Sequence, residues 1–593
     1  NNLYKTIYIV IVLCWSAVLG LSQNGDNRVW DKLPTDDKYI IGKLENGLTY
    51  YIRESKSTEG RADFYIIHNV GSLQENDNQR GLAHFLEHMA FNGTKNFPDK
   101  GLLEYFASIG VKFGNNINAY TSMDRTVYNI SAVPVDKRET IIDSALLAIH
   151  DWSHYINCNM EEIDKERGVV REEWRRGDEP RTRMFKGVNM AIQKGSRFAQ
   201  RDVIGVMDII DTFSRETLID YYHKWYRPDL QAVVVIGDID ASDIEQRIKS
   251  RFSQIPAKKD GAEREVYSIP GNKEPHIVFI TDPESQATNV KYVVKIPLRS
   301  QQERQTSLAL YDKALQDMIQ ELMRVRLDAA AKDKNAGFRR VVPIFGSISY
   351  AIETFAFTAM PKDSKNTADA LRDIAIEIER VKQHRFSEQE LEIARKSAKA
   401  NLTKNYNRSK DVKNADYVSA AVEHFTRQSP LVTVDSSYEI SKRILNSITL
   451  EDLNGSVDRF LTDSNLVVIF FTNESLKSHL PSKEDVQEIL LLAKETSHEP
   501  FQSEGVKAIP SPVIKSKGSI VSEKNVSAKD IGIKHIKDFE DAVEWKLDNG
   551  IRVIWKSDPE ADNLVRMSAF RDGGYSRDLS LDKIKTLQSF ILL

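Results

Sequence analysis

The stretch that decides the fold lies near the start of the chain and reads Lys43-Leu44-Glu45-Asn46-Gly47-Leu48-Thr49-Tyr50-Tyr51. Its Asn-Gly pair is typical of a tight turn, because glycine adopts positive φ without strain, and the residues after it have strand composition. The pattern recurs about 500 positions later as Lys546-Leu547-Asp548-Asn549-Gly550-Ile551-Arg552-Val553-Ile554. About twenty residues after each copy comes a second match, Asn69-Val70-Gly71-Ser72 in one case and Asp572-Gly573-Gly574 in the other. Two matches at a similar offset predict a duplicated domain.

Between the two copies, short strand-like runs alternate with longer helical ones. The first cycle predicts strands at 49–52, 64–67, 126–130 and 232–237, and helices at 80–91 and 102–108. A second cycle begins near Glu274, with strands at 276–280, 291–295 and 466–470, and helices around 302–332, 367–384 and 387–406. This mixture predicts an α+β protein rather than a regularly doubly wound one.

The same patterns suggest domain boundaries. We expect a first domain at 30–265, a second at 270–500, a linker at 501–540 and the start of a third domain at 541–593. The linker is indicated by proline, serine and lysine with few aromatic residues. The last stretch is shorter than the first two domains, so we expect the third repeat to be incomplete and the chain to be a fragment.

Composition excludes several classes of protein. The chain has 593 residues, of which 41% are hydrophobic and 28% charged, which excludes a disordered, collagen-like or multi-span membrane protein. The formal net charge is −4, whereas proteins that bind nucleic acid usually carry an excess of positive charge, and we expect no nucleic-acid partner. The two cysteines are Cys14 and Cys158, so removal of the start of the chain would leave a single thiol and no intrachain disulfide.

The first residues resemble a secretory signal. Lys5 precedes an apolar run from Ile7 to Leu21, which is shorter than the roughly 20 residues that cross a bilayer, and small residues precede a possible cut after Ser22. We therefore expect residues 1–22 to be a signal peptide. The mature chain would then be exported across the inner membrane, to the periplasm, with no stable membrane span. An uncleaved N-terminal anchor is the alternative.

The sharpest chemical feature is His84-Phe85-Leu86-Glu87-His88. On a helix, His84 and His88 are four residues apart, so both imidazoles point to one face and can share a metal ion. Glu87 is near enough to hold a water molecule at that ion. Two imidazoles and a carboxylate suit zinc with one position left open, and zinc lowers the pKa of a bound water to roughly 7. The order His-x-x-Glu-His is the inverse of the common zinc-peptidase signature.

Two further patterns bear on this site. His150 and His154 have the same spacing, but Ser153 stands in place of the glutamate, and we expect this pair on a solvated helix face. Glu166 and Glu173 lie seven residues apart in a predicted helix, which is two turns on one face, and either could be the third ligand. A structural zinc with four protein ligands would need a further histidine or cysteine, and the sequence offers no obvious one.

Together these motifs resemble the inverted-zincin metallopeptidases of the pitrilysin, insulinase and mitochondrial processing peptidase family (M16), most closely its bacterial, secreted, four-domain zinc proteases. The resemblance rests on residues 84–94, on Asn118-Ala119-Tyr120-Thr121 with Thr126 and Tyr128, on 166–173, and on Tyr226-Arg227-Pro228 before the apolar run 233–238. It implies repeated two-layer domains, each a mostly antiparallel sheet covered by helices. The first would be catalytic, the second inactive and the third cut short.

The resemblance also implies roles for individual residues. His84, His88 and Glu173 would bind Zn²⁺, Glu87 would be the general base, and Glu166 would support the site from behind. On spacing alone Glu166 is the better third ligand, because Glu173 lies further from His88 than is usual in the family. The local pattern Glu166, Val170, Glu173 nevertheless favours Glu173, since a loop insertion changes the count without changing the helix. Asn118, Ala119 and Tyr120 match an edge strand that receives substrate by strand addition.

The predicted reaction is hydrolysis of peptide bonds in extended or unfolded peptides, with Glu87 activating the attacking water. In this family the second half of the molecule contributes groups that stabilise the oxyanion. We therefore expect this chain to bind zinc but to hydrolyse poorly without the missing C-terminal half or a companion subunit. The alternative is a non-catalytic peptide-binding or assembly subunit on the same fold.

Overall fold

The computed structural model describes residues 30–136, 139–258, 261–409, 412–502, 518–527, 530, 542–557, 565 and 567–569. The chain forms two compact units, at 1–503 and 504–593. The predicted signal peptide and the Asp572-Gly573-Gly574 match lie outside the described residues, as does most of the predicted linker.

The first unit begins with a six-stranded sheet. Its strands are β1 (Tyr39–Lys43), β2 (Thr49–Glu54), β3 (Arg61–His68), β4 (Ile117–Thr121), β5 (Thr126–Pro134) and β6 (Gln231–Gly237). They are arranged in the order β1-β2-β6-β3-β5-β4, and only the β2–β6 pair is parallel within this sheet. β6 lies inside the sheet and every one of its residues is buried, as its continuous apolar sequence predicts. β4 lies at the edge, where its outer hydrogen-bonding groups have no neighbouring strand of this sheet.

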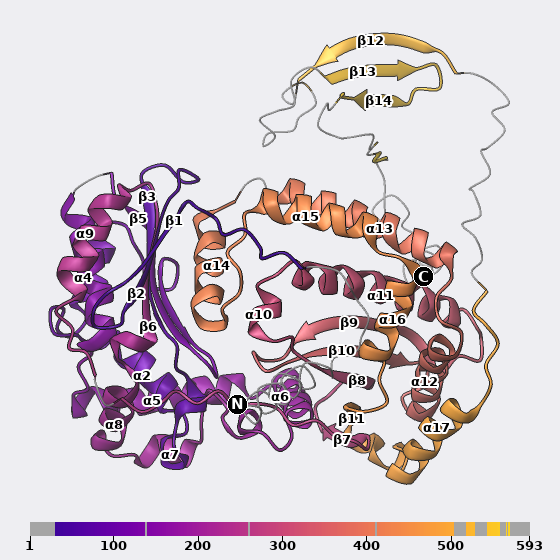
Figure 1. Cartoon of the computed structure of the whole chain (residues 1–593), viewed down its shortest axis with the longest axis horizontal. Coiled ribbons are helices and arrows are strands. Elements are labelled where there is room, and N and C mark those ends of the chain that lie inside the picture. Colours follow the sequence, from indigo (N-terminus) through magenta and orange to yellow (C-terminus); the bar gives the residue numbers. More distant parts are fainter. Residues whose placement is uncertain are drawn as a thin grey trace, which may run out of the picture. The chain divides into compact units, whose positions relative to one another are not determined.

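Helices cover one face of this sheet (Figure 1). They are α2 (Leu82–Met89), α3 (Gly101–Ser108), α4 (Glu139–His154), α5 (Met160–Gly177), α7 (Met207–Thr212), α8 (Arg215–Trp225) and α9 (Ala241–Phe252). Helix α6 (Pro180–Ile192) follows α5 in the chain but packs elsewhere. The main core forms between the sheet and these helices and includes Phe64, Phe85 and Trp152, all fully buried. Each such side chain stabilises the fold by roughly 1.5–3 kcal/mol or more. α2 is shorter than the predicted helix at 80–91, because Gly81 has φ +104 and the helix begins after it.

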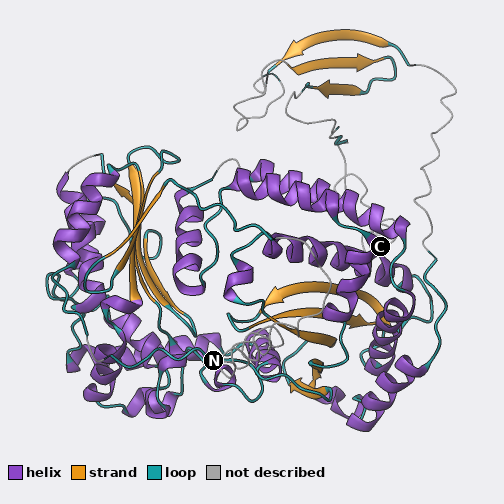
Figure 2. Ribbon diagram, viewed as in Figure 1, coloured by secondary structure: helices purple, strands orange, loops and turns teal. Residues whose placement is uncertain are grey.

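A second sheet repeats this plan within the same unit. Its strands are β7 (His276–Asp282), β8 (Asn289–Pro297), β9 (Phe338–Ser347), β10 (Ile352–Pro361) and β11 (Leu466–Asn473), in the order β7-β11-β8-β10-β9. The order matches that of β2-β6-β3-β5-β4, and here too one pair, β7–β11, is parallel. The expectation of repeated, mostly antiparallel sheets covered by helices is confirmed (Figure 2).

The helices in this second half of the unit are α10 (Gln301–Arg304), α11 (Leu308–Ala330), α12 (Thr367–His384), α13 (Glu388–Arg408), α14 (Asn414–Arg427), α15 (Val434–Ser447), α16 (Leu450–Phe460) and α17 (Lys483–Glu495). The predicted helix at 302–332 is two helices, because the chain turns between α10 and α11. The hairpin of β9 and β10 was not predicted, since Pro343 and Gly346 obscure its alternating pattern.

Each sheet is also covered by one helix from the other half of the unit. Val418, Ala421 and Val422 of α14 pack on the free face of the first sheet, against residues that include Val127 and Val234. In the same way, Val188, Ala191 and Ile192 of α6 pack against residues of the second sheet, Val293 and Ile469 among them. The exchange is visible in Figure 1, where α14 lies beside the first sheet and α6 beside the second. The two halves therefore share their cores.

The second unit contains β12 (Ile520–Val526), β13 (Ala542–Leu547) and β14 (Arg552–Trp555), which form an antiparallel sheet. The turn between β13 and β14 repeats the turn between β1 and β2. Gly47 and Gly550 both have positive φ, and each amide donates to the carbonyl of a leucine, Leu44 or Leu547. The recurrent sequence thus forms the same hairpin twice. The proposed domain boundaries remain predictions.

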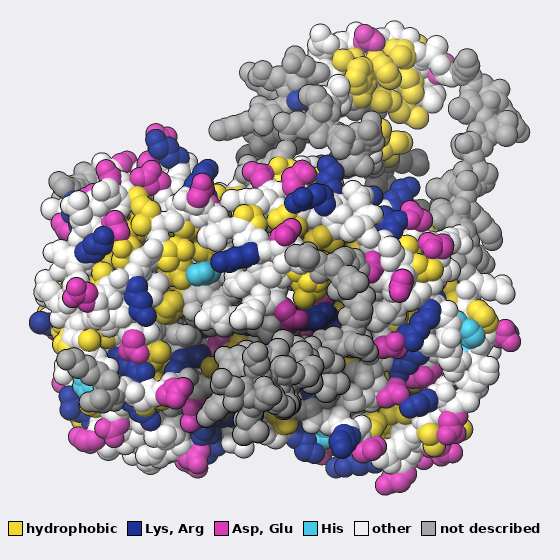
Figure 3. Space-filling view, viewed as in Figure 1, with side chains coloured by type: hydrophobic (Ala, Val, Ile, Leu, Met, Phe, Trp, Pro, Cys, Tyr) yellow, Lys and Arg dark blue, Asp and Glu magenta, His cyan; other side chains and the backbone are white. Residues whose placement is uncertain are grey.

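Charged side chains of both signs are interspersed over the visible face of the molecule (Figure 3). Among the described residues, no helix is long and apolar enough to cross a membrane.

Candidate metal centre and substrate cleft

Helix α2 carries the three residues of the His-x-x-Glu-His motif. The rings of His84 and His88 face each other edge-on, with centroids 4.7 Å apart. His84 and Glu87 are each only 8% exposed, and the opposite side of the helix is packed into the core through Phe85 and Leu86. The start of α2 is held by the buried Glu75, whose carboxylate accepts hydrogen bonds from the backbone amides of Gly81 and Ala83, at 3.0 and 2.8 Å. The core packing and the hydrogen bonds to Glu75 therefore hold the helix, and with it the two histidines, in a fixed position.

Helix α5 brings a carboxylate to the same point. The Oε2 atom of Glu173 lies 3.6 Å from Nε2 of His84 and 3.3 Å from Nε2 of His88. The three ligand atoms all lie within 4.8 Å of one another, and no other such group of three was found among the described residues. Tetrahedral zinc with bonds of about 2.0–2.2 Å separates neighbouring ligand atoms by roughly 3.3–3.6 Å. The two distances from Glu173 to the histidine nitrogens therefore fit a shared zinc ion.

Glu166 lies behind this cluster rather than in it. Its Oε1 atom is 2.7 Å from Nδ1 of His88, and its Oε2 atom accepts a hydrogen bond from the side-chain amide of Asn92 at 2.6 Å. A carboxylate on Nδ1 fixes the orientation of the ring and leaves Nε2 free to face a metal. The two glutamates of α5, two turns apart, thus contact opposite nitrogens of one imidazole.

The electrostatics of the cluster follow from burial and from these contacts. Burial and the neighbouring His88 lower the pKa of His84 to about 4, which leaves its imidazole neutral. Burial also opposes a charge on His88, but hydrogen bonds with Glu166 and Glu173 outweigh it and raise the pKa of His88 to about 9. The hydrogen bond with His88 lowers the pKa of Glu173. A metal ion at this point would replace the proton of His88 as the positive charge next to Glu166 and Glu173.

Glu87 is held by the edge strand β4. The hydroxyl of Thr121 donates a hydrogen bond of 2.5 Å to Oε2 of Glu87. Burial raises the pKa of Glu87, and the bond from Thr121 partly offsets that effect. A carboxylate with a raised pKa beside a metal centre is suited to accept and return a proton.

The predicted substrate strand is β4 itself. Asn118, Ala119 and Tyr120 lie on it and pair with Asn129, Tyr128 and Val127 of β5. Its other edge faces no strand of this sheet, which is the arrangement to which an extended peptide can add. The side chain of Tyr120 is 43% exposed, and Ala119 and Tyr120 line the cleft that leads to Glu87.

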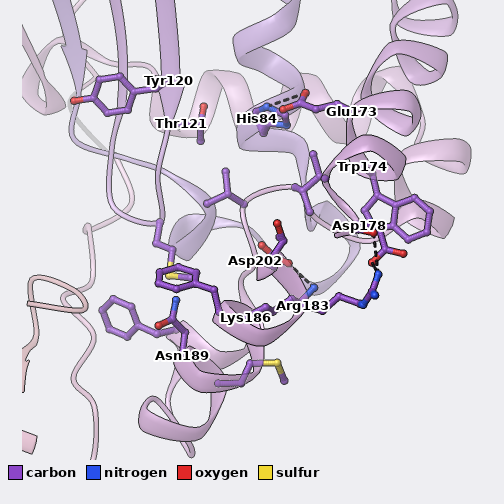
Figure 4. A pocket seen from close by; sticks show the side chains of 18 of the residues that line it. His84, Tyr120, Thr121, Glu173, Trp174, Asp178, Arg183, Lys186, Asn189 and Asp202 are labelled. Carbon is purple, nitrogen blue, oxygen red and sulfur yellow. Dashed lines mark hydrogen bonds and ion pairs between the residues drawn. The ribbon is translucent and has the colours of Figure 1, made fainter. Parts of the chain in front are cut away.

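A cavity of about 660 Å³ opens beside the metal centre. His84 and Glu173 lie at one end of it (Figure 4). Glu87, the strand β4, the helices α5 and α6 and the segment 198–204 also contribute to its lining. Trp174, Phe185 and Met190 line it and are each more than 40% exposed, although they are large and apolar. The cations beside them are paired: Arg183 contacts Asp178 at 3.2 Å and Asp282 at 2.5 Å, and Lys186 contacts Asp202 at 2.5 Å. The free lining is therefore mainly apolar.

The other histidine pair differs from expectation. His150 is only 8% exposed and packs against Tyr155 and Phe252, so the prediction of a solvated helix face was wrong for this residue. Its face of α4 packs against α9, a contact between helices that local spacing does not reveal.

Sequence reasoning assigned no role to several residues around the cluster. Thr121 ends the Asn118–Thr121 motif, but its bond to Glu87 depends on how β4 lies against α2. Asn92 follows His88 by four residues, and this spacing could have suggested that it shares the same face. The cavity residues of α6 carried no recognisable signal.

The helix pair and the inverted motif are those of an inverted zincin, a class of metallopeptidases. Residues 50–200 match the family model of insulinase (peptidase family M16), and residues 212–398 match that of the peptidase M16 inactive domain. The two models together cover more than half of the chain, which belongs to peptidase family M16.

Curated relatives and solved structures agree with this assignment. "Probable zinc protease PqqL" of Haemophilus influenzae is 29% identical over 574 residues, covering 95% of this chain and 58% of the relative. Its Escherichia coli counterpart is 30% identical over 428 residues, covering 71% of this chain and 45% of the relative. The crystal structure of the first half of the periplasmic protease PqqL from Escherichia coli matches with a TM-score of 0.71 and 26% identity, covering 79% of this chain and 100% of that one. The chain thus spans about half the length of the curated relatives it matches.

Proposed function

We propose that this chain is the zinc-binding part of a metalloendopeptidase that hydrolyses peptide bonds in extended or unfolded peptides. The observation that carries the proposal is the convergence of His84, His88 and Glu173, with Glu87 held beside them by Thr121. The relatives named as zinc proteases support it.

In this proposal His84, His88 and Glu173 would hold the zinc ion, and Glu166 would orient His88. When bound, zinc would polarise the substrate carbonyl and lower the pKa of water. Glu87 accepts a proton from the attacking water and then donates it to the leaving amine, so the proton count balances across the reaction. The bond from Thr121 orients the Glu87 carboxylate through both transfers.

Substrate binding in this proposal uses the edge of β4. An extended peptide would add to Asn118, Ala119 and Tyr120 through backbone hydrogen bonds, which do not depend on its sequence. A folded substrate would offer no free strand of this kind, which is why we propose extended or unfolded peptides. Sequence preference would come instead from the cavity beside the metal centre.

The apolar lining of that cavity predicts a preference for a large apolar side chain next to the scissile bond. Replacing Phe185 with Ser should lower kcat/KM for such peptides by roughly 10-fold to 100-fold, because one apolar contact is lost in the bound state. Peptides with alanine at that position should be affected far less. The measurement is kcat/KM for two peptides that differ only at that residue.

Leu491→Ser is the matched control, because Leu491 is also a large exposed apolar residue but lies on α17, outside the cavity lining. If Phe185→Ser lowers turnover of both peptides equally, the cavity does not select the side chain.

We further propose that the protein acts in the periplasm, as the Escherichia coli relative is described to do. Because the matched relatives are about twice as long, we also propose that full turnover requires a second half or a companion subunit. Adding such a half in trans should then raise peptide turnover without changing the zinc content of this chain.

A further inference from the structure

The turn that joins β4 to β5 is tied to the second half of the unit. Arg125 lies in this turn, and its Nη1 atom is 2.7 Å from Oε1 of Glu423 on α14. The same nitrogen donates to the hydroxyl of Thr426 at 2.9 Å. Arg427, one turn along from Glu423, lies 3.3 Å from its Oε2 atom and 3.6 Å from the carboxylate of Asp124. Charges of alternating sign thus join α14 to the turn.

This contact is shielded from water. The side chains of Arg125 and Asp124 are 13% and 8% exposed, and that of Glu423 is 32% exposed. Ion pairs between fully exposed residues contribute little to stability, but screening by water and salt falls as the groups are covered. The Arg125–Glu423 pair can therefore hold its geometry.

Helix α14 is itself firmly placed. Its apolar residues pack on the first sheet, the ring nitrogen Nδ1 of His424 lies 2.7 Å from the hydroxyl of Tyr51, and the backbone carbonyl of Tyr417 accepts a hydrogen bond from Tyr39. A charge placed on this helix is fixed relative to the sheet.

The turn connects directly to the proposed general base. Ser122 and Arg125 close it, through a backbone hydrogen bond of 2.8 Å from the amide of Ser122 to the carbonyl of Arg125. The neighbouring residue, Thr121, donates to Glu87. A continuous series of contacts therefore runs from Glu423 through Arg125 and Thr121 to Glu87.

We propose that Glu423, on α14 in the second half of the unit, is a positioning residue for the metal centre. It holds the β4–β5 turn, and with it the Thr121 hydroxyl, in the place where Thr121 orients Glu87. The proposal rests on the proposed peptidase function for its catalytic consequence, but the hold on the turn is independent of that function. The second half of the unit then contributes to the site without binding metal or substrate.

The first test is hydrogen exchange of the backbone amides at 117–130 in the whole chain. Glu423→Gln keeps the shape of the side chain and removes its charge, and it should make the amides of Ser122 and Arg125 exchange faster. Asp463→Asn is the matched control, because Asp463 pairs with Lys382 and Lys494 in the second half and belongs to none of these contacts. If the hydrogen exchange rates of these amides are the same in Glu423→Gln as in the unmutated chain, the proposal is overturned.

The second test is kinetic. Glu423→Gln should lower kcat by roughly 2-fold to 10-fold, the value of one hydrogen bond, with little change in KM or in zinc content. In a Thr121→Val background the same substitution should have no further effect on kcat, because the series of contacts is already broken. A merely structural role would instead give the same loss in both backgrounds, and this result would overturn the proposal. If the unmutated chain hydrolyses no peptide, the proposed function fails, and the exchange measurement still decides whether Glu423 holds the turn.

Discussion

Replacing Glu87 with Gln is expected to lower peptide hydrolysis by roughly 100-fold to 10,000-fold, the usual contribution of a general base. The amide has nearly the same shape and can still accept the hydrogen bond from Thr121, but it cannot take up a proton at neutral pH. Zinc content should stay unchanged, because the clustered donor atoms belong to His84, His88 and Glu173. The measurement is the rate of peptide cleavage together with metal analysis of the same sample.

The control for this experiment is Glu104→Gln, an exposed glutamate on α3, which should leave both quantities unchanged. A Glu87→Gln variant that cleaves at the unmutated rate would mean that the activity comes from another site or from a contaminant. The result also separates a peptidase from a non-catalytic peptide-binding subunit, because such a subunit would not hydrolyse peptides even before the substitution.

Replacing Glu173 with Gln should weaken zinc binding by roughly 100-fold or more and abolish hydrolysis at limiting zinc, because an anionic ligand becomes a neutral, weaker donor. Without this carboxylate, the two imidazoles are the only unaltered members of the donor cluster. The measurement is a competition titration with a chelator of known affinity.

Glu172→Gln makes the same chemical change one position earlier on α5, where the side chain pairs with Arg175 and not with the histidines. It should bind zinc as the unmutated chain does. Equal affinities for the two variants would remove Glu173 from the ligand set.

The parts of the site that could be predicted are those fixed by local periodicity. Four-residue spacing on α2 and seven-residue spacing on α5 each place side chains on one helix face, whatever the rest of the fold. Helical periodicity could not decide between Glu166 and Glu173, because the choice depends on how α5 is positioned along α2. In the structure Glu173 faces both Nε2 atoms, whereas Glu166 faces Nδ1 of His88.

The parts that could not be predicted depend on contacts between distant segments. Thr121 contacts Glu87 across 34 positions, and Arg125 contacts Glu423 across nearly 300. The residues that surround each of these positions in the sequence do not indicate either contact. The same holds for the exchange of α6 and α14 between the two sheets, since an amphipathic helix does not reveal which sheet it covers. By contrast, the Asn-Gly turn is determined by its own residues and forms in the same way at Gly47 and Gly550.

X-ray absorption at the zinc edge, on the chain loaded with one equivalent of zinc, addresses the ligand set itself. We expect four nitrogen or oxygen neighbours at about 2.0–2.2 Å, of which two are imidazoles, and no sulfur. A spectrum that showed three or more imidazoles, or a thiolate at about 2.3 Å, would contradict this expectation.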